Sequence, residues 1–386
     1  MSSGREGVRG DAPDVWEPDL PRTAAVRTGP LRSGWTTGTC AAAAAKAAAI
    51  LLAGDAPPTT VEIALPDAQR VAFPVACTVQ GDGWAEAVVI KDAGDDPDVT
   101  HGAHLTVRLH RVTQPGIEYR AGEGVGTVTK PGLGLEVGGP AINPIPRAQI
   151  ATAIEEVLDL GRQGVVCEIC VPGGERMARK TTNARLGILG GISILGTSGI
   201  VRPFSTASWR ASVIQAIDVL AAQGLDTVVL TTGGRTERAA MRLLPELPEV
   251  CFVEVGDFTG AALRQAVADG LRRCIFVGMA GKLTKLAAGV MMTHYTRSKV
   301  DLAVLAEICA EAGGTAEVVA AVAHANTARH AYELLRVHRV SRAPSLLCDR
   351  VAANFERFTD GRVSAAVVMV DFDSLEPVGI SKGYAS

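Results

Sequence analysis

The sequence predicts a two-part protein: an α+β N-terminal domain followed by an α/β Rossmann-like domain whose sheet is mostly parallel. Its 386 residues exceed what one small core usually organises. Short β-rich segments separated by turns fill residues 60–112, whereas strands and helices alternate from residue 165 onward. Repeated βα units are typical of parallel sheets covered by helices. We therefore expect a flexible tail at residues 1–29, a mixed α+β domain at 30–160 and the Rossmann-like domain at 161–386.

The composition is that of a globular protein, with 47% hydrophobic and 20% charged residues, which excludes a disordered or fibrous chain. The formal net charge of −3 provides no global attraction for nucleic acid. An anionic ligand would therefore have to be bound by a local cluster of cations.

The eight cysteines lack the regular spacing of a disulfide scaffold, and the first residues lack the apolar core of a signal peptide. Cys167 and Cys170 form a C-x-x-C pair, but two residues three apart on a strand point to opposite faces. We expect no metal site, reduced thiols and a cytoplasmic location.

The first folded element is expected to be a helix over residues 41–53, a run of small apolar side chains interrupted by Lys46. This run is shorter than the ~20 residues that a membrane span needs, so no membrane association is expected. Thr36 and Thr37 precede the helix among glycines and could bind an anion at its positive end. A capped helix without a ligand explains the same residues equally well.

Four strands are expected next, at residues 61–65, 71–79, 84–90 and 104–112. Between the last two strands lies an acidic stretch that includes Asp92, Asp95, Asp96 and His101. Its spacing does not match a calcium loop, so a solvated turn is the simpler interpretation. A helix over residues 147–160, opened by Pro146, closes the first domain.

The second domain is built from alternating elements. Strands are expected at residues 165–171, 226–232, 251–255 and 274–278, and helices at 207–223, 235–244, 259–270 and 282–292. Further helices follow at 303–312, 316–325, 327–337 and 344–358, and residues 362–371 are expected to add an edge strand to the same sheet.

Residues 172–203 form the most informative segment because glycines, hydroxyl residues and cations occur together in it. Glycines such as Gly190 and Gly191 let a backbone N–H approach a ligand closely. The cations of the segment are Arg176, Arg179, Lys180 and Arg185, which can pair with carboxylates or phosphates. A glycine-rich connector is the alternative, and the added cations favour a binding site.

Three predicted strand ends carry residues suited to a ligand, and ligands of parallel sheets bind at the carboxyl ends of the strands. Thr232, Gly233 and Gly234 follow one strand, and Asp257 follows the next. Residues 278–282 resemble a phosphate-binding loop, but Phe276 replaces its leading glycine and Leu283 its magnesium-binding hydroxyl. A phosphate-cleaving enzyme is therefore not expected.

Six motifs in order resemble the cobalt-precorrin-5B C(1)-methyltransferases of cobalamin biosynthesis. They are SGWTTGTCAAAAAKAA, KDAGDDPDVTHGA, GEGVGTVTKPGL, NPIPR, PGGERMARKTTNARLGILGGISILGTSGIVRP and GKLTKLAAGVMMTH, and the resemblance spans roughly residues 30–370. One departure is Met279, which stands where the family usually has a histidine.

The resemblance implies transfer of a methyl group from S-adenosylmethionine to C-1 of a cobalt-containing tetrapyrrole, giving cobalt-precorrin-6A. Substrate carboxylates would then meet Thr36, Thr37 and the four cations of residues 172–203. The donor would contact Gly190, Gly191, Thr232, Gly233, Gly234 and Asp257. A ring proton could be removed by His294 or by a carboxylate such as Asp92 or Asp95, although a structural histidine also explains His294.

Two other functions remain open at this level: a corrinoid-binding protein without catalysis, and an NAD-dependent corrinoid reductase. The first is favoured by the lack of an obvious catalytic dyad. The second is weakened because the glycines after Val171 lack the G-x-G-x-x-G spacing. A homo-oligomer is compatible with the sequence.

Overall fold

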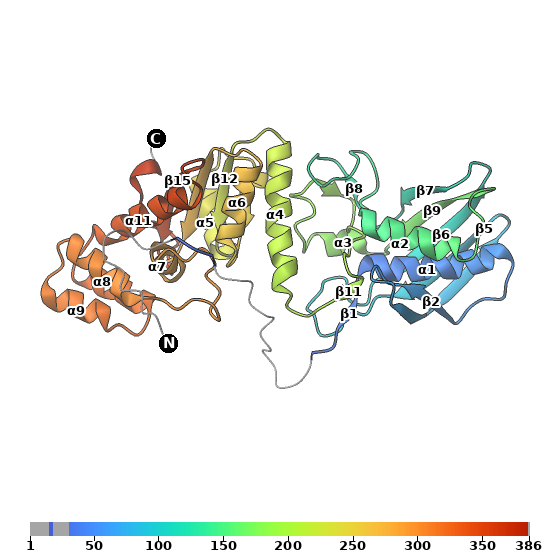
Figure 1. The fold of residues 1–386 in the computed structure, drawn as a ribbon, viewed down its shortest axis with the longest axis horizontal. Helices are drawn as coiled ribbons and strands as arrows, with labels where there is room; N and C mark the ends of the chain where they lie inside the picture. Colours follow the sequence, from blue (N-terminus) through green and yellow to red (C-terminus); the bar gives the residue numbers. More distant parts are fainter. Residues whose placement is uncertain (1–14, 18–30, 385–386) are drawn as a thin grey trace, which may run out of the picture. The chain divides into compact units, whose positions relative to one another are not determined.

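A computed structural model describes residues 15–17 and 31–384 of the chain (Figure 1). Its internal contacts divide the chain after Ser205. We call residues 31–205 the N-terminal unit and residues 206–384, together with 15–17, the C-terminal unit. The expected combination of α and β structure in several sheets is confirmed.

The main sheet of the N-terminal unit has the strand order β4-β5-β6-β9-β7, and all its pairings are antiparallel except the one between β7 and β9. Its strands are β4 (Cys77–Gly81), β5 (Trp84–Ile90), β6 (His104–Val112), β7 (Ile117–Ala121) and β9 (Gly164–Cys170). Shorter ladders join β2 (Thr60–Ala64) to β3 (Arg70–Pro74), β1 (Gly34–Trp35) to β11 (Ile200–Val201), and β8 (Thr127–Val128) to β10 (Ile188–Leu189).

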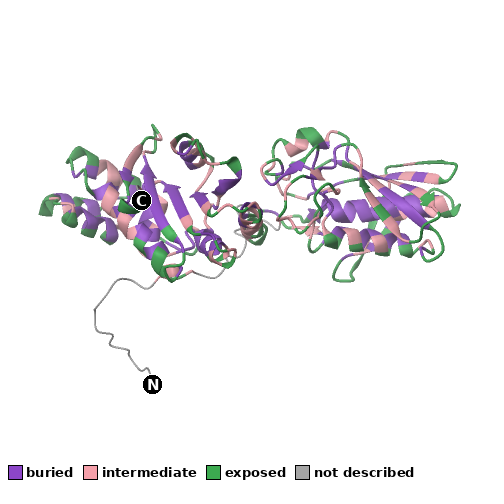
Figure 2. Cartoon of the chain, turned by 90° about the horizontal axis from the view of Figure 1, so that it is seen from above, coloured by how far each residue is buried: buried purple, intermediate pink, exposed green. Residues whose placement is uncertain are grey.

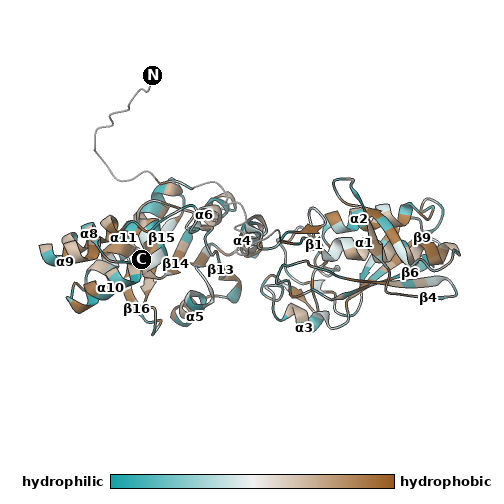
Figure 3. Ribbon diagram, turned by 90° about the horizontal axis from the view of Figure 1, so that it is seen from below, coloured by the Kyte–Doolittle hydropathy of each residue, from teal (hydrophilic) through white to brown (hydrophobic). Residues whose placement is uncertain are grey.

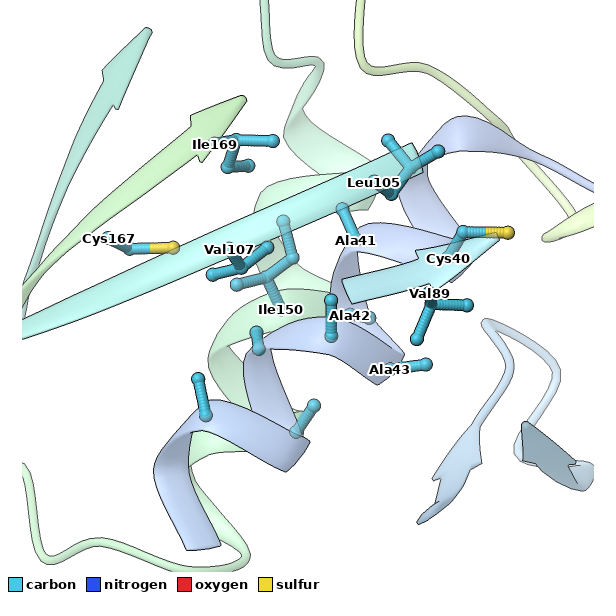
Figure 4. Packing of buried hydrophobic residues seen from close by; sticks show 14 of the residues in the cluster. Cys40, Ala41, Ala42, Ala43, Val89, Leu105, Val107, Ile150, Cys167 and Ile169 are labelled. Carbon is cyan, nitrogen blue, oxygen red and sulfur yellow. The ribbon is translucent and has the colours of Figure 1, made fainter. Parts of the chain in front are cut away.

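Helix α1 (Thr37–Ala53) forms the centre of this unit and packs on β5, β6 and α2 (Pro144–Glu155). The alanines at 41–45 and 47–49 are fully buried, and their small side chains let the helix approach the sheet closely. Val89, Leu105 and Val107 of the sheet and Ile150 of α2 surround the helix in Figure 4. The interrupting Lys46 is accommodated because its ammonium group donates to the Glu62 carbonyl oxygen and pairs with the Glu156 carboxylate.

Two expectations for this unit were wrong. The strand near residue 165 was assigned to the Rossmann-like sheet, but β9 pairs with β6 and β7, so the chain divides after residue 205 and not after 160. The expected strand over residues 71–79 is two strands in different ladders, β3 and β4. Pro74 ends the first of them, and it lacks the N–H that a continuing ladder would use.

The C-terminal unit contains a sheet with the strand order β13-β12-β14-β15-β16, in which β16 is antiparallel to β15 and the other pairings are parallel. The strands are β12 (Thr227–Thr231), β13 (Phe252–Glu254), β14 (Arg273–Gly278), β15 (Ser364–Val370) and β16 (Pro377–Ile380). Figure 2 shows that the sheet is mostly buried, and burial is greatest along β12, β13, β14 and β15.

Helices cover this sheet, with α5 on β12, β13 and β14, and α11 on β15 and β16. The helices are α4 (Thr206–Ala222), α5 (Gly234–Leu243), α6 (Thr259–Ala268), α7 (Ala280–Ala287), α8 (Leu302–Glu311), α9 (Ala316–Ala323), α10 (Ala328–Val337) and α11 (Ala343–Phe358). Short helix α3 (Gly174–Ala178) belongs to the N-terminal unit, and 3-10 turns occur at Glu249–Cys251 and Lys382–Tyr384. Figure 3 shows that α8 and α9 are mostly hydrophobic, in contrast to α5.

Three further differences from expectation occur here. Strand β15 lies inside the sheet, because β16 pairs with its outer edge. Helix α7 ends at Ala287, and Gly289 follows with φ of +84°. Most of residues 1–29 lies outside the described residues, but Trp16 bonds to Gly289 and Met291 through its backbone. Within residues 31–384, no helix is long and apolar enough to cross a membrane.

Candidate functional site

The segment 172–203 is joined to the rest of the N-terminal unit by isolated β-bridges, which pair Val125 with Ile192 and Ile142 with Ile194. Gly191 is required by this packing: a Cβ atom there would lie 2.1 Å from the Gly124 carbonyl oxygen. Gly190 is different, since it is exposed, has φ of +84° and has no heavy atom within 4 Å of the Cβ position. Gly190 is thus open to a ligand, whereas Gly191 serves the fold.

The cations of this segment stand on or near α3. Arg176, Arg179 and Lys180 are exposed, and Arg179 forms an exposed ion pair with Glu175 at 3.3 Å. Exposed pairs of this kind contribute about 0–1 kcal/mol, so Arg179 can exchange Glu175 for another carboxylate. Arg185 is half-buried, and its carbonyl oxygen accepts a hydrogen bond from Lys130.

The hydroxyls at the start of α1 are used by the protein itself. Thr36 caps the helix by accepting from the Thr39 N–H, and the Thr37 hydroxyl lies 3.2 Å from the Leu195 carbonyl oxygen and accepts from the Leu195 N–H. Both threonines are buried. The arrangement corresponds to a capped helix joined to residues 193–199, which is the alternative without a ligand.

The acidic stretch 91–101 is an ordered loop clamped by Arg32. The Arg32 guanidinium pairs with Asp92, and its backbone N–H donates to Asp95 at 2.7 Å. Hydrogen bonds from Arg32 and from the Gly94 N–H lower the pKa of Asp92 to about 2. A carboxylate with such a low pKa is a weak general base at neutral pH.

A buried ion pair supports this loop from below. The Lys91 side chain is 1% exposed, and its Nζ lies 2.6 Å from Oδ2 of Asp98. Burial alone would raise the pKa of Asp98, but the Lys91 ammonium and the hydrogen bonds from Thr100 lower it by more. The pKa of Asp98 is therefore below its usual value. Asp98 also borders an open hollow of about 480 Å³. Its lining residues are Leu31, Gly94, Asp95, Asp96, Pro97, Asp98, His101 and Phe204.

In the C-terminal unit, the predicted donor-binding residues lie at the carboxyl edge of the parallel sheet. Thr232, Gly233 and Gly234 connect β12 to α5, where the Thr236 hydroxyl accepts from the backbone N–H groups of Thr232 and Gly233. Around Gly233 and Gly234, the nearest heavy atoms to a Cβ position are 3.9 and 3.8 Å away. The turn is therefore both fixed and uncrowded.

Lys282 connects the ends of two strands and was not among the predicted site residues. Its Nζ donates to the carbonyl oxygens of Gly256 at 2.7 Å and Thr232 at 3.4 Å, and lies 3.2 Å from Oδ1 of Asp257. A lysine in the first turn of a helix is opposed by the helix dipole, so such a residue needs nearby acceptors. That position in the sequence was the available signal.

His294 lies in a loop after α7. It is half-buried, its Nδ1 lies 2.8 Å from the Thr296 hydroxyl, and its ring stacks on Tyr295 with centroids 4.7 Å apart. The preceding Thr293 donates its hydroxyl to Oδ1 of Asp257 at 2.8 Å. The chain thus holds His294 close to the sheet edge that carries Asp257.

Trp209 of α4 is a second residue that the sequence interpretation missed. Its indole is 49% exposed and lies against Gly256, with Nε1 3.2 Å from the Cβ position. It offers a flat apolar surface beside the residues that Lys282 contacts. An exposed tryptophan on an otherwise regular helix gives no signal of this neighbour in the sequence.

Comparison with known proteins gives matches along the chain. The profile of the CbiD family matches residues 24–203, and that of the CbiD C-terminal domain matches residues 292–377. A cobalt-precorrin-5B C(1)-methyltransferase of Rubrobacter xylanophilus is 64% identical over 96% of both chains. The chain belongs to the CbiD family.

A second methyltransferase relative agrees with this membership. A cobalt-precorrin-5B C(1)-methyltransferase of Salinispora arenicola is 63% identical over 97% of this chain and 99% of its own. A crystal structure of a cobalamin biosynthesis protein from Archaeoglobus fulgidus matches at 30% identity with a TM-score of 0.37, covering 68% of this chain and 82% of that one. The first CbiD profile nearly coincides with the N-terminal unit.

The predicted site residues of this CbiD chain therefore fall into two groups. The N-terminal unit carries Thr36, Thr37, Asp92, Asp95, Arg176, Arg179, Lys180, Arg185, Gly190 and Gly191, and the C-terminal unit carries Thr232, Gly233, Gly234, Asp257 and His294. Within the C-terminal group, hydrogen bonds of Lys282 and Thr293 bring the strand ends together.

Proposed function

We propose that this chain transfers the methyl group of S-adenosylmethionine to C-1 of cobalt-precorrin-5B, giving cobalt-precorrin-6A in cobalamin biosynthesis. The observation that carries the proposal is the family: relatives named as cobalt-precorrin-5B C(1)-methyltransferases are 63–64% identical over at least 96% of the chain. The eight cysteines, all among the described residues, are free thiols, which supports a reducing, cytoplasmic setting.

The donor is proposed to bind at the carboxyl edge of the Rossmann-like sheet in the C-terminal unit. The uncrowded Gly233 and Gly234 at the start of α5 leave room for a group that approaches the backbone, and the positive end of the helix suits the carboxylate of the donor. Asp257 supplies an acceptor for ribose hydroxyls. Trp209 adds an apolar face for the adenine ring.

The tetrapyrrole is proposed to bind on residues 172–203. Its acetate and propionate groups need cations, and Arg176, Arg179 and Lys180 are exposed. The same segment exposes half of the side chains of Leu189 and Leu195, which suit the apolar face of the ring. Thr36 and Thr37 act behind this surface by holding residues 193–199 and are not proposed as ligands.

Methyl transfer is an in-line displacement: the bond from the methyl carbon to sulfur breaks as the bond to C-1 forms. Alignment of the two reactants supplies much of the rate, and no covalent nucleophile is required. We propose His294 as the acceptor of any proton that the ring releases. Asp92 and Asp95 are less suited, since Arg32 binds both of them.

The names of the relatives as methyltransferases favour methyl transfer over the two alternatives, corrinoid binding without catalysis and NAD-dependent reduction. The test is incubation with cobalt-precorrin-5B and isotopically labelled S-adenosylmethionine under reducing, oxygen-free conditions, followed by mass spectrometry. One labelled methyl group should appear in the tetrapyrrole. A product without the label would contradict the proposal.

A matched pair of arginine variants tests the acceptor surface. Arg176→Met should raise the KM for the tetrapyrrole by about ten- to a hundredfold, the range expected for losing a charge-assisted hydrogen bond. Arg162→Met is the control, because Arg162 lies in the same unit with a side chain 90% exposed and only a 3.6 Å pair with Asp159. Equal KM values for the two variants would move the tetrapyrrole away from α3.

A further inference from the structure

Lys282 is held so completely by the protein that it cannot serve as a free cation for a ligand. An ammonium group has three hydrogens to donate. The neighbours of the Lys282 Nζ are the carbonyl oxygens of Thr232 and Gly256 and the Oδ1 atom of Asp257, at 3.4, 2.7 and 3.2 Å. These acceptors come from the ends of the adjacent strands β12 and β13. The lysine therefore fixes these strand ends to α7.

Within the part of the chain that the structure describes, the side-chain contacts of Asp257 involve only one of its two carboxylate oxygens. Lys282 and the Thr293 hydroxyl both meet Oδ1, at 3.2 and 2.8 Å, and among the described residues no donor bonds to Oδ2. The side chain is 28% exposed, so Oδ2 is accessible from the sheet edge. A carboxylate held in this way presents its second oxygen in a fixed direction.

The second lysine of α7, Lys285, contributes indirectly by binding Thr293. Lys285 donates through Nζ to the Thr293 carbonyl oxygen at 2.8 Å, and the Thr293 N–H donates to the Asp257 carbonyl oxygen at 3.1 Å. Thr293 is 2% exposed, so its hydroxyl is directed inward and away from solvent. Helix α7 thus holds Asp257 directly through Lys282 and indirectly through Thr293.

We propose that Lys282 and Thr293 are positioning residues that clamp Oδ1 of Asp257 so that Oδ2 accepts a ribose hydroxyl of the methyl donor. This inference rests on the proposed function, because it needs a nucleoside at this sheet edge. Neither residue touches the donor. Their effect is on selectivity for the hydroxyl, since a fixed carboxylate rejects a nucleoside that leaves it unpaired.

The test compares binding of S-adenosylhomocysteine with binding of its 2′-deoxy and 3′-deoxy analogues by calorimetry. The intact protein should bind the parent compound at least about tenfold more tightly than the analogue that lacks the contacting hydroxyl, as expected for a hydrogen bond to a charged group. Lys282→Met and Thr293→Val should reduce this ratio to below about threefold, as should Asp257→Asn. Lys382→Met, at a side chain 90% exposed in the same unit, should leave it unchanged.

The ratio separates a positioning role from a merely structural one, because loss of folded protein lowers binding of both compounds equally. Thr293→Val keeps the shape of the side chain and the Lys282 contacts, so it tests the clamp even where Lys282→Met fails to fold. An unchanged ratio in the folded variants, or a wild-type protein that binds all compounds alike, would overturn the inference and leave methyl transfer intact. A wild-type protein that binds none of them would overturn the donor site itself.

Discussion

Replacing Asp98 by asparagine leaves the Lys91 ammonium group unpaired in a nearly dry environment. Lys91 is 1% exposed, and its Nζ lies 2.6 Å from the carboxylate that the change removes. Removing one partner of a buried ion pair costs about 3–5 kcal/mol. We expect Asp98→Asn to lower the free energy of unfolding of the N-terminal unit by about 4 kcal/mol at pH 7.

A second, independent estimate sets an upper limit on the loss of unfolding free energy in Asp98→Asn. A lysine in water has a pKa of about 10.4, so removing its proton costs about 4.6 kcal/mol at pH 7 and about 1.9 kcal/mol at pH 9. The folded variant can avoid an unpaired buried charge by releasing this proton from Lys91. Because its native state then binds fewer protons than its unfolded state, its stability rises with pH. The penalty of Asp98→Asn should therefore fall to about 2 kcal/mol at pH 9.

The contribution of the wild-type pair also rises with pH, but it does so in another pH range. The pKa of Asp98 is lowered in the folded protein, so its contribution is complete above the unfolded value of about 3.9 and is lost as the pH falls through the folded value. Between pH 7 and pH 9 the wild-type pair should make a constant contribution. The change in penalty across that interval then belongs to the variant.

Hydrogen exchange of the β5 and β6 amides measures this unit separately from the other one, which a global melt would not. The double variant Lys91→Met with Asp98→Asn is the control, because replacing a buried pair by apolar volume is often close to neutral. A penalty below about 1 kcal/mol, or one that does not change between pH 7 and pH 9, would refute the reasoning.

Two further predictions concern packing and pH. Gly191→Ala should destabilise the N-terminal unit more than Gly190→Ala, because its Cβ would meet the Gly124 carbonyl oxygen, whereas Gly190→Ala carries only the cost of a positive φ, about 1–2 kcal/mol; equal losses in denaturant titrations would contradict this. Burial, followed by the nearby Asp269, raises the pKa of Asp218 to about 6, so the stability that this group contributes is present at low pH and is lost as pH rises through 6. The shift corresponds to about 3 kcal/mol before solvent screening and to about 1 kcal/mol after it, since Asp218 is only partly buried. Asp218→Asn should raise the thermal midpoint at pH 7.5 and not at pH 4, and an equal rise at both values would exclude this carboxyl pair as the cause.

The positions of the strand ends in the C-terminal unit could be predicted, because strands and helices alternate regularly along this part of the sequence. Parallel strands joined by helices bring their carboxyl ends to one edge, so Thr232 and Asp257 were expected to be neighbours without knowledge of any contact. The role of Lys282 could not be predicted in the same way, because residues 278–282 resemble a phosphate-binding loop only in part. Two of its three acceptors are backbone carbonyl oxygens, which every residue has and which no sequence pattern marks.

The sheet to which β9 belongs could not be predicted. Its run of apolar residues indicates a strand buried on both faces, and this is equally true of a parallel sheet and of the position between β6 and β7. The roles of Gly190 and Gly191 were also indistinguishable in the sequence. Only the position of the Gly124 carbonyl oxygen separates a glycine that the fold requires from one that is open.

The contacts of residues 15–17 make the N-terminal unit an insertion within the C-terminal one. Trp16 pairs with Val290, and Glu17 pairs with Arg264 and packs against Gly260, so the C-terminal unit draws on the chain both before and after residues 31–205. A fragment that starts at residue 206 would leave the Arg264 charge and the backbone of residues 289–291 without these partners. Separation of the two halves at the junction after Ser205 would thus remove contacts that hold the segment leading into Thr293 and His294.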